Sequence, residues 1–571
     1  MLVTSIVIIS LLAALVFSNV RPSLLFIGTV IVLYITDNVS QQDVLGNIVN
    51  TSVLTLISLM LASLVLEKTQ LLTWISSKVF RPSYRKTIFR LGIGTAISSA
   101  LLNNTAVVAT MMSGIQRNQE HAASRLLMPL SYFAIVGGTI TLIGTSTNLI
   151  VNALIIEQGL PSLSFFSFLP VGLLLFILVG CVIALSSYRL KSSDSTKDNT
   201  DAYFIDAEVL PNSKLIGKSV IENRLRALDG LFLAEIVRGD ELLSPVAPNM
   251  VIQQGDKLIF TGDVSQVKQL NMLDGVEVFA DSSKLLSENL IEVIVSPESI
   301  LIGRTLKNTE FRSRFDAAVV AIKRQGQKLS GKLGEQSIFA GDKLVLAVGQ
   351  DFSKRQNLSR NFFILTGKQL HQPLSIKANF FAIGGFIAAI LVSVVSSVSL
   401  LEMMALYLIF MVASDILDGT TLRRRFPFEL WLILVCALSI AQAFRESGLA
   451  DFLSDGVFSF VGSQNPYFAL VILFIVTVLL TETITNTAAA AITLPIGLSL
   501  ATAYNVSTLP FIMAVAYAAS ASFISPFGYQ TNLMVMNAGG YKVMDFIKTG
   551  WKVSLVYTAV SLCFIPLFFP F

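Results

Sequence analysis

The stretch LLNNTAVVAT, from Leu101 to Thr110, places two adjacent amides and a hydroxyl inside a strongly apolar run. Asparagine and threonine side chains carry neutral oxygens that can bind a small cation such as sodium. Their N–H and O–H groups, together with the amides at a helix N-terminus, can donate hydrogen bonds to an anion. Asn103, Asn104 and Thr105 therefore offer the chemistry of an ion-binding site.

Related motifs recur in both halves of the chain. ITNTAAAAI around Asn486 parallels LNNTAVVAT around Asn104, and GYQTNLMV around Asn532 parallels GTSTNLIV around Asn148. In the second pair, a glycine four residues before the asparagine allows a helix to unwind, and the asparagine can cap the helix that resumes. Small polar residues often join transmembrane helices simply by packing. One motif would fit that alternative, but four matched motifs argue against it.

Composition places these motifs in a membrane. The chain has 571 residues, 53% of them hydrophobic and 14% charged, with a mean hydropathy of +0.70. Apolar runs suited to a bilayer core of about 30 Å lie near 2–18, 22–36, 50–66, 126–155 and 165–187, and again near 374–396, 400–418, 428–445, 510–537 and 553–570. We expect a polytopic α-helical membrane protein.

The two sets of runs predict two transmembrane repeats, at 1–190 and 370–571. Each would contain five transmembrane helices and one re-entrant hairpin, so the odd number of crossings inverts the second repeat relative to the first. The hairpins, near 88–112 and 468–498, would carry the Asn-Thr motifs at their tips. Because irregular backbone at membrane depth must be buried in protein or line a watery cavity, we expect the tips to meet near the midplane.

Charge placement predicts the orientation. Basic residues cluster within 81–90, 423–425 and 542–552, and short cytoplasmic loops are enriched in lysine and arginine. The polar region from 190 to 370 should therefore be cytoplasmic, with both termini outside an inner (plasma) membrane.

That polar region repeats itself. LIGKSV at Leu215 matches LIGRTL at Leu301, and GDKLIF at Gly255 matches GDKLVL at Gly341, each displaced by 86 positions. We predict two small α/β domains, at 203–285 and 288–368. Their motif spacing resembles the TrkA-C (RCK-C) domains of potassium-uptake proteins, which implies a module that dimerises and sometimes binds a nucleotide-type regulatory ligand. The alternative is a stability module without a ligand.

The paired hairpin motifs and paired helix breaks resemble the divalent anion:sodium symporter family, over about 1–190 and 370–571. Family members carry Ser-Asn-Thr at both tips, where this chain has Asn-Asn-Thr and Thr-Asn-Thr. The resemblance implies one sodium site from Ser99, Asn103, Asn104 and the Gly144 carbonyl, and another from Thr481, Thr485, Asn486 and the Gly528 carbonyl. It places the substrate against Asn104, Thr105, Asn486 and Thr487.

The residues at the helix breaks bear on the substrate. Dicarboxylate carriers of this family usually have a proline pair before the break asparagine, whereas this chain has Ser-Thr and Gln-Thr. The additional donors suit a compact tetrahedral oxyanion, and they are Thr145, Ser146, Tyr529 and Gln530. We expect import of a divalent anion, with sulfate favoured, together with sodium. The family resemblance implies a homodimer that works by an elevator-type movement. The alternative is a sodium- or proton-coupled dicarboxylate transporter.

Glu482 leaves a choice between proton coupling and structure. It stands near the second predicted tip, and ionisable side chains at membrane depth frequently mark ion or proton pathways. Its carboxylate could instead bind a neighbouring polar side chain or a helix end.

Other function classes fit less well. A channel gated by the inserted pair would need a filter, and the chain lacks a TVGYG-like segment. The only histidines, His121 and His371, show no metal-ligand or nucleophile–base spacing, so an enzyme is not expected. The formal charge of only +4 gives no reason to expect nucleic-acid binding.

Overall fold

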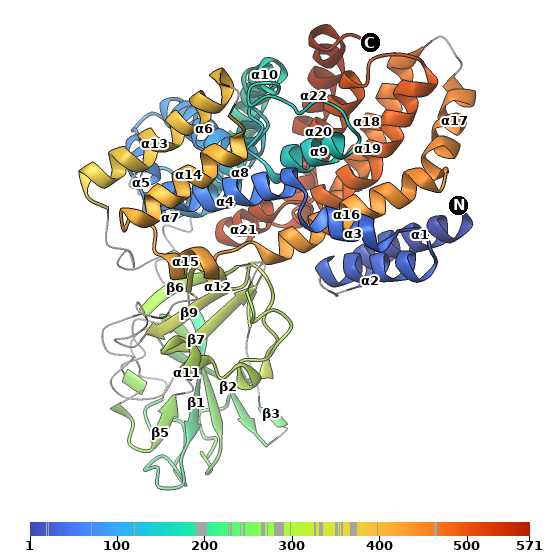
Figure 1. Cartoon of the computed structure of the whole chain (residues 1–571). Helices are drawn as coiled ribbons and strands as arrows, with labels where there is room; N and C mark the ends of the chain where they lie inside the picture. Colours follow the sequence, from blue (N-terminus) through green and yellow to red (C-terminus); the bar gives the residue numbers. More distant parts are fainter. Residues whose placement is uncertain are drawn as a thin grey trace.

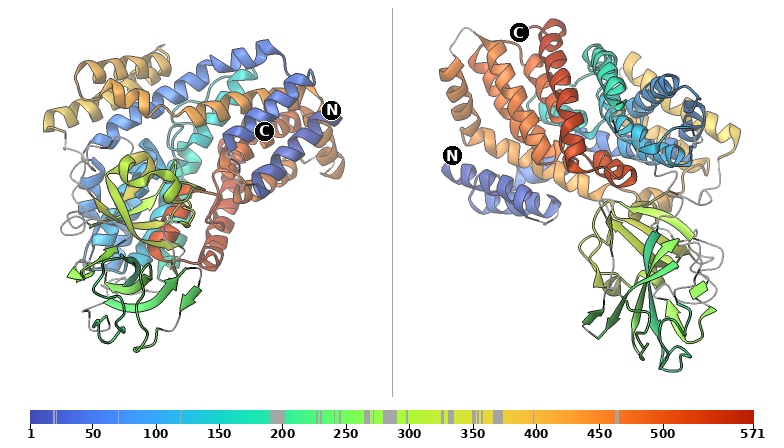
Figure 2. Two further views of the ribbon diagram at one scale, coloured as in Figure 1. Left: turned by 90° about the horizontal axis from the view of Figure 1, so that it is seen from below. Right: turned by 180° about the vertical axis from the view of Figure 1, so that it is seen from behind.

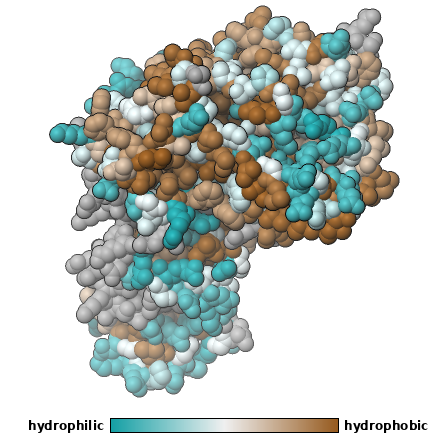
Figure 3. Space-filling view, viewed as in Figure 1, coloured by the Kyte–Doolittle hydropathy of each residue, from teal (hydrophilic) through white to brown (hydrophobic). Residues whose placement is uncertain are grey.

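In the computed structural model, the chain forms a helical membrane part and a smaller strand-rich part that projects from one side of it (Figure 1). The structure describes residues 1–571 except 19, 21, 70, 119, 189, 191–201, 226–227, 229–230, 240, 244–245, 264–268, 271, 279–289, 297–298, 325–326, 330–334, 349–351, 353–354, 356–357, 366–373, 397 and 462–464. His371 lies outside the described residues. Hydrophobic side chains gather on the membrane part and hydrophilic ones on the strand-rich part (Figure 3).

The helices before the strand-rich part are α1 (Leu2–Phe17), α2 (Pro22–Ile35), α3 (Gln41–Ile48), α4 (Thr51–Lys68), α5 (Leu71–Val79), α6 (Tyr84–Leu101), α7 (Asn104–Arg117), α8 (Ala123–Gly138), α9 (Ser146–Glu157) and α10 (Leu169–Ser187). Those after it are α13 (Ile376–Val395), α14 (Leu400–Ala413), α15 (Gly419–Arg424), α16 (Phe428–Glu446), α17 (Leu449–Val461), α18 (Pro466–Thr483), α19 (Asn486–Ala503), α20 (Leu509–Ala519), α21 (Gln530–Gly539) and α22 (Val543–Phe568). Within the described ranges, 7 helices are long and apolar enough to cross a membrane. The prediction of a polytopic helical membrane protein is confirmed.

Two of the predicted apolar runs are broken helices. Residues 126–155 form α8 and α9 with an irregular break at 139–145, and residues 510–537 form α20 and α21 with a break at 520–529. Each hairpin is longer than its predicted range, since α6 already begins at Tyr84 and α19 extends to Ala503. The prediction followed apolar residues and so missed the basic first turn of α6, whose charges do not prevent a helix.

The two halves pack across one another. α2 packs on α16, and α4 packs on α14. Within each half, the first hairpin arm packs on the helix that precedes the break, α6 on α8 and α18 on α20. The views in Figure 2 show the helices from both halves side by side, with the strand-rich part on one side of them.

The strand-rich part contains two five-stranded antiparallel sheets. The first is built from β1 (Ala202–Val209), β2 (Leu231–Arg238), β3 (Glu241–Leu243), β4 (Lys257–Asp263) and β5 (Val276–Val278), in the order β3-β2-β4-β1-β5. The second is built from β6 (Leu290–Val295), β7 (Ala317–Arg324), β8 (Gln327–Lys328), β9 (Lys343–Val348) and β10 (Phe362–Ile364), in the order β10-β6-β9-β7-β8. The orders are equivalent, so each sheet repeats the other. We expected α/β units, but the helices described here are short: η2 (Lys307–Thr309), α11 (Phe311–Phe315) and α12 (Leu358–Asn361).

The repeated Gly-Asp-Lys-Leu motif has a structural role in both sheets. The buried carboxylate of Asp256 accepts two hydrogen bonds of 2.8 Å from the Arg238 guanidinium. Asp342 accepts the same pair from Arg324, at 2.8 and 2.7 Å. This hydrogen bonding raises the pKa of the Arg238 guanidinium above its ordinary value. The motif aspartate therefore ties the turn before β4 or β9 to the neighbouring strand.

Candidate functional site

The first residue of each hairpin triplet caps a helix. The side-chain oxygen of Asn103 accepts a hydrogen bond of 2.9 Å from the Thr105 backbone N–H at the start of α7. The Thr485 hydroxyl accepts one of 3.4 Å from the Ala488 N–H at the start of α19. Asparagine and threonine are common at this position because they satisfy amides that the first turn leaves free. These two side chains serve the helix starts in the structure.

Oxygen atoms converge at the first hairpin tip. The Ser99 hydroxyl contacts the Asn104 Oδ1 atom and lies 2.7 Å from the Ala134 carbonyl oxygen. The same Oδ1 atom lies 3.2 Å from the Ala134 carbonyl oxygen and 3.3 Å from that of Gly144. Turning the amide over would place its NH₂ among these acceptors. In the present orientation the NH₂ instead donates to the Tyr529 hydroxyl, at 2.6 Å.

The two orientations of the Asn104 amide differ in what they can bind. With the amide turned over, its NH₂ donates to the Ser99 hydroxyl and to the Ala134 and Gly144 carbonyls, and its oxygen accepts from the Tyr529 hydroxyl, so its hydrogen bonds are satisfied within the protein. The present orientation instead turns the oxygen toward a position that a cation could occupy. Uncharged oxygens that face one another repel, and a small hard cation such as sodium is bound by oxygens of these types. Gly138 lies against the same atoms. A methyl group on its Cα would come within 2.7–2.8 Å of the Asn104 amide and 3.1 Å of the Gly144 carbonyl oxygen. The residue types and the spacing therefore fit a sodium ion carried as a transported species.

A matching cluster lies at the second hairpin tip. The Thr481 hydroxyl lies 2.8 Å from the Asn486 Oδ1 atom and 2.6 Å from the Ala519 carbonyl oxygen. A methyl group on Gly528 would collide with the Ser522 hydroxyl and come within 2.7 Å of the Thr481 carbonyl oxygen. Hydroxyl, amide and alanine carbonyl thus recur in the same relation at both tips.

The break asparagines fasten the irregular segments. Asn148 donates a 2.9 Å hydrogen bond from its NH₂ to the Thr141 carbonyl, and Asn532 donates one of 2.9 Å to the Ser522 carbonyl. Our prediction that they cap α9 and α21 is wrong, because Thr145 and Tyr529 occupy the cap positions. Each asparagine sits at the third residue of its helix, from which the amide reaches back to the break.

A glycine in the last helix of each half lets that helix pack directly against a break. A methyl group on Gly172 of α10 would lie 2.8 Å from the Thr139 carbonyl oxygen, and one on Gly550 of α22 would collide with the Phe523 carbonyl. The backbone of each break is therefore in direct contact with the last helix of its half.

The first hairpin meets the second break. Besides the Asn104–Tyr529 hydrogen bond, the Thr145 and Tyr529 hydroxyls lie 3.5 Å apart. The Thr105 hydroxyl lies 3.3 Å from the Gln530 side-chain oxygen. In keeping with these contacts, α7 packs on α21 and α9 packs on α19. Exposed Ser146 begins α9, and half-buried Thr487 lies in the first turn of α19.

The carboxylate of Glu482 is held by the second break. It accepts hydrogen bonds from the backbone N–H groups of Phe523, Ile524 and Ser525, at 2.8, 2.9 and 2.7 Å. The Ser522 hydroxyl adds a longer one of 3.4 Å. An ionised carboxylate only accepts hydrogen bonds, so these donors suit the charged form. The contact gives Glu482 a structural role in joining the hairpin to the break.

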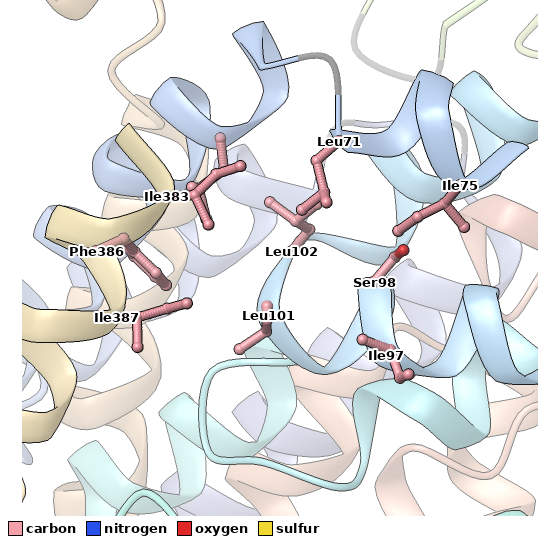
Figure 4. A pocket seen from close by; sticks show the side chains of 10 residues that line it. Leu71, Ile75, Ile97, Ser98, Leu101, Leu102, Ile383, Phe386 and Ile387 are labelled. Carbon is pink, nitrogen blue, oxygen red and sulfur yellow. The ribbon is translucent and has the colours of Figure 1, made fainter. Parts of the chain in front are cut away.

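A cavity of about 60 Å³ behind the first hairpin does not belong to this site (Figure 4). Its lining is Leu66, Leu71, Ile75, Ile97, Ser98, Leu101, Leu102, Ile383, Phe386 and Ile387. The one polar side chain, Ser98, donates its hydroxyl to the Gly94 carbonyl at 2.7 Å. A hydrocarbon lining cannot compensate an anion for lost hydration.

A family model now places the chain among known proteins. The model for citrate transporters matches residues 7–496 and 361–571. The chain belongs to the citrate transporter family. Membership agrees with the predicted likeness to anion:sodium symporters.

The chain is also similar to three curated proteins. A Chlamydomonas reinhardtii protein, described as a candidate sulfur deprivation response regulator, is 30% identical over 565 residues, which cover 93% of this chain and 95% of that protein. Sodium/sulfate cotransporter 2 of the same alga is 26% identical over 365 residues, 61% of this chain and 41% of that protein. The sodium-dependent low-affinity dicarboxylate transporter 1 of Caenorhabditis elegans is 29% identical over 150 residues, 26% of each chain.

Several atoms of the candidate site could not be predicted from the sequence. The Ala134 and Ala519 carbonyls carry no signal in residue type, since every residue has a carbonyl. Gly138 could have been noticed, because it ends α8 beside a second glycine. The backbone donors to Glu482 became apparent only when the hairpin and the break were seen together.

Replacing Tyr529 by phenylalanine is expected to raise the substrate concentration needed for half-maximal uptake about 5- to 30-fold. The reason is that removal of a hydroxyl that accepts a hydrogen bond from Asn104 costs roughly 1–2 kcal/mol. The measurement is the concentration dependence of uptake into proteoliposomes. Tyr407→Phe is the control, because it removes a buried hydroxyl that donates to the Ala382 carbonyl on α13. Equal uptake constants in the two variants would contradict a role for Tyr529 in the site.

Proposed function

We propose that this chain is a sodium-coupled secondary transporter that imports a divalent anion, with sulfate as the preferred substrate. The observation that carries the proposal is the oxygen cluster around Asn104, directly beside the Tyr529 hydroxyl. With a cation bound, the Asn104 amide would present its oxygen to that cation and its NH₂ to the Tyr529 hydroxyl. Binding of the two ions next to each other would offset their charges.

Two sodium sites follow from the matched clusters. The first uses Ser99, Asn104 and the Gly144 carbonyl, and the second uses Thr481, Asn486 and the Gly528 carbonyl. Asn103 and Thr485 remain proposed ligands, although their side chains serve as helix caps. The donors around Glu482 favour sodium over proton coupling, because three backbone N–H groups stabilise the charged carboxylate.

The anion would bind where four helices begin. α7, α9, α19 and α21 start at Asn104, Ser146, Asn486 and Gln530, and helix N-termini favour negative charge. The Thr145 and Tyr529 hydroxyls lie together at this place. The relative named as a sodium/sulfate cotransporter supports the choice of sulfate.

The architecture we propose is an inverted repeat, with halves at 1–190 and 370–571, working as a homodimer by an elevator-type movement. The support is the one-to-one order of helices in the two halves and the matching contacts at both tips. The inserted sheets, within 203–285 and 288–368, would be a TrkA-C-like regulatory pair on the cytoplasmic side of an inner (plasma) membrane. Both termini would lie outside.

Uptake of radiolabelled sulfate into proteoliposomes, with and without an inward sodium gradient, tests the function. We expect sodium to stimulate uptake at least tenfold, with no inhibition by excess succinate or citrate. Inhibition by succinate would support the second candidate, a dicarboxylate transporter, which the nematode relative favours. Uptake driven by a pH gradient and indifferent to sodium would contradict the proposed coupling.

A further inference from the structure

The second inserted sheet touches the membrane part at a glycine. Gly341, in the turn before β9, is buried and has a φ of +82°. A methyl group at this position would collide with the side-chain amide of Asn537 and lie 3.5 Å from Leu533, both on α21. The backbone of this turn therefore lies directly against the side chains of α21. Figure 1 shows this sheet beside α21 and α15.

The equivalent turn of the first sheet is free of this contact. Gly255 occupies the same place before β4, with nearly the same φ of +79°, but it is exposed and a methyl group there would have no atom within 4 Å. The two copies share the backbone conformation and differ in what lies against it. At this turn, contact with α21 is therefore found in the second copy and not in the first.

The faces of the two sheets have diverged accordingly. In the first sheet, Glu208 of β1 pairs in register with Glu277 of β5. At the same register in the second sheet, Ile294 of β6 pairs with Phe363 of β10. Ile294 is buried in the hydrophobic core of the membrane part, and Phe363 packs against that core. One copy therefore has an acidic pair where the other has an apolar contact surface.

The helix that receives this contact also begins at the candidate site. Asn537 lies near the C-terminal end of α21, and Gln530 at its N-terminus contacts Thr105 of the first hairpin. A helix of 10 residues spans about 15 Å at 1.5 Å per residue. Movement of the Gly341 turn would be transmitted directly to the break.

We propose that the second inserted sheet is a docking module that holds α21 and thereby sets the transport rate. The inference rests on the proposed function, because it names α21 as the route by which the inserted pair acts on the transport site. The Gly255 turn of the first sheet has no such contact, so the first sheet would act through the second.

The test compares Gly341→Ala with Gly255→Ala in the full-length protein. Both variants carry the same penalty for alanine at a positive φ, so only the collision with Asn537 differs. We expect backbone amides of α21 to exchange hydrogen at least tenfold faster in Gly341→Ala than in Gly255→Ala. Sulfate uptake should be at least fivefold lower in Gly341→Ala than in Gly255→Ala. Adding Asn537→Ala to Gly341→Ala should restore both quantities, because it removes the colliding amide.

Equal exchange in α21 and equal uptake in the two glycine variants would overturn the docking inference. Failure of the Asn537→Ala change to rescue would also count against it, since a general defect of the sheet would then explain the loss. Hydrogen exchange in α21 could differ between the two glycine variants while the unchanged protein shows no sodium-driven uptake. That result would support docking and overturn the proposed function.

Discussion

Sodium-driven uptake is expected to fall at least 100-fold when Gly138 is replaced by alanine. The added methyl group would come within 2.7–2.8 Å of both polar atoms of the Asn104 amide and 3.1 Å of the Gly144 carbonyl oxygen, distances shorter than ordinary contacts with carbon. Because Asn104 also contacts Ser99 and Tyr529, it cannot move aside without losing other partners. The measurement is initial uptake at a series of sodium concentrations, with protein folding checked by thermal unfolding.

Gly384→Ala is the matched control for this loss. Gly384 lies within α13, and a methyl group there would have no atom within 4 Å. Alanine in an open helical position should stabilise the helix by roughly 0.5–1 kcal/mol and leave uptake unchanged. If Gly138→Ala transports as well as this control, the oxygen cluster around Asn104 is not an ion site.

The second large effect concerns Glu482. Its replacement by alanine leaves three backbone N–H groups of the second break without their acceptor. Each unsatisfied buried donor costs about 1–3 kcal/mol, so we expect a lower unfolding temperature and no measurable uptake. Glu482→Gln keeps one acceptor oxygen and should retain roughly a tenth of the uptake. Because sodium is the proposed coupling ion, the pH dependence of that residual uptake should match the unchanged protein.

The control for Glu482 is an exposed carboxylate with a comparable bond. Glu402 accepts a 2.9 Å hydrogen bond from the Ser399 N–H at the start of α14, and Glu402→Ala should cost only about 0.5–1 kcal/mol. Uptake by that variant should be unchanged. Sodium-independent, proton-driven uptake that disappears in Glu482→Gln would instead make this residue a proton carrier.

Much of the membrane part could be predicted from side-chain types. The repeated Asn-Thr pairs marked the hairpin ends, where α7 and α19 begin at Asn104 and Asn486. The breaks near Gly144 and Gly528 followed from the same pattern. The repeated Gly-Asp-Lys-Leu motif begins just before β4 in one five-stranded sheet and just before β9 in the other.

The remaining features depend on backbone groups and on contacts between distant segments. Ala134 contributes a carbonyl, and its methyl side chain gives no sign of that role. The donors to Glu482 are amides about 41–43 positions away, which no local pattern relates to a glutamate. The difference between Gly341 and Gly255 is likewise invisible in the motif that they share. It becomes evident only when α21 is found against one of them.

Each hairpin packs against a helix from the opposite half, since α7 contacts α21 and α19 contacts α9. A half-length chain would therefore contain only half of each helix pair. If such a chain were the ancestor of an inverted repeat, it would have had to insert into the membrane in both orientations. Two copies of opposite orientation would then have had to associate with each other. Fusion of two copies into one polypeptide removes that need, and it leaves each half free to specialise, as the tyrosine at 529 and the threonine at 145 already differ.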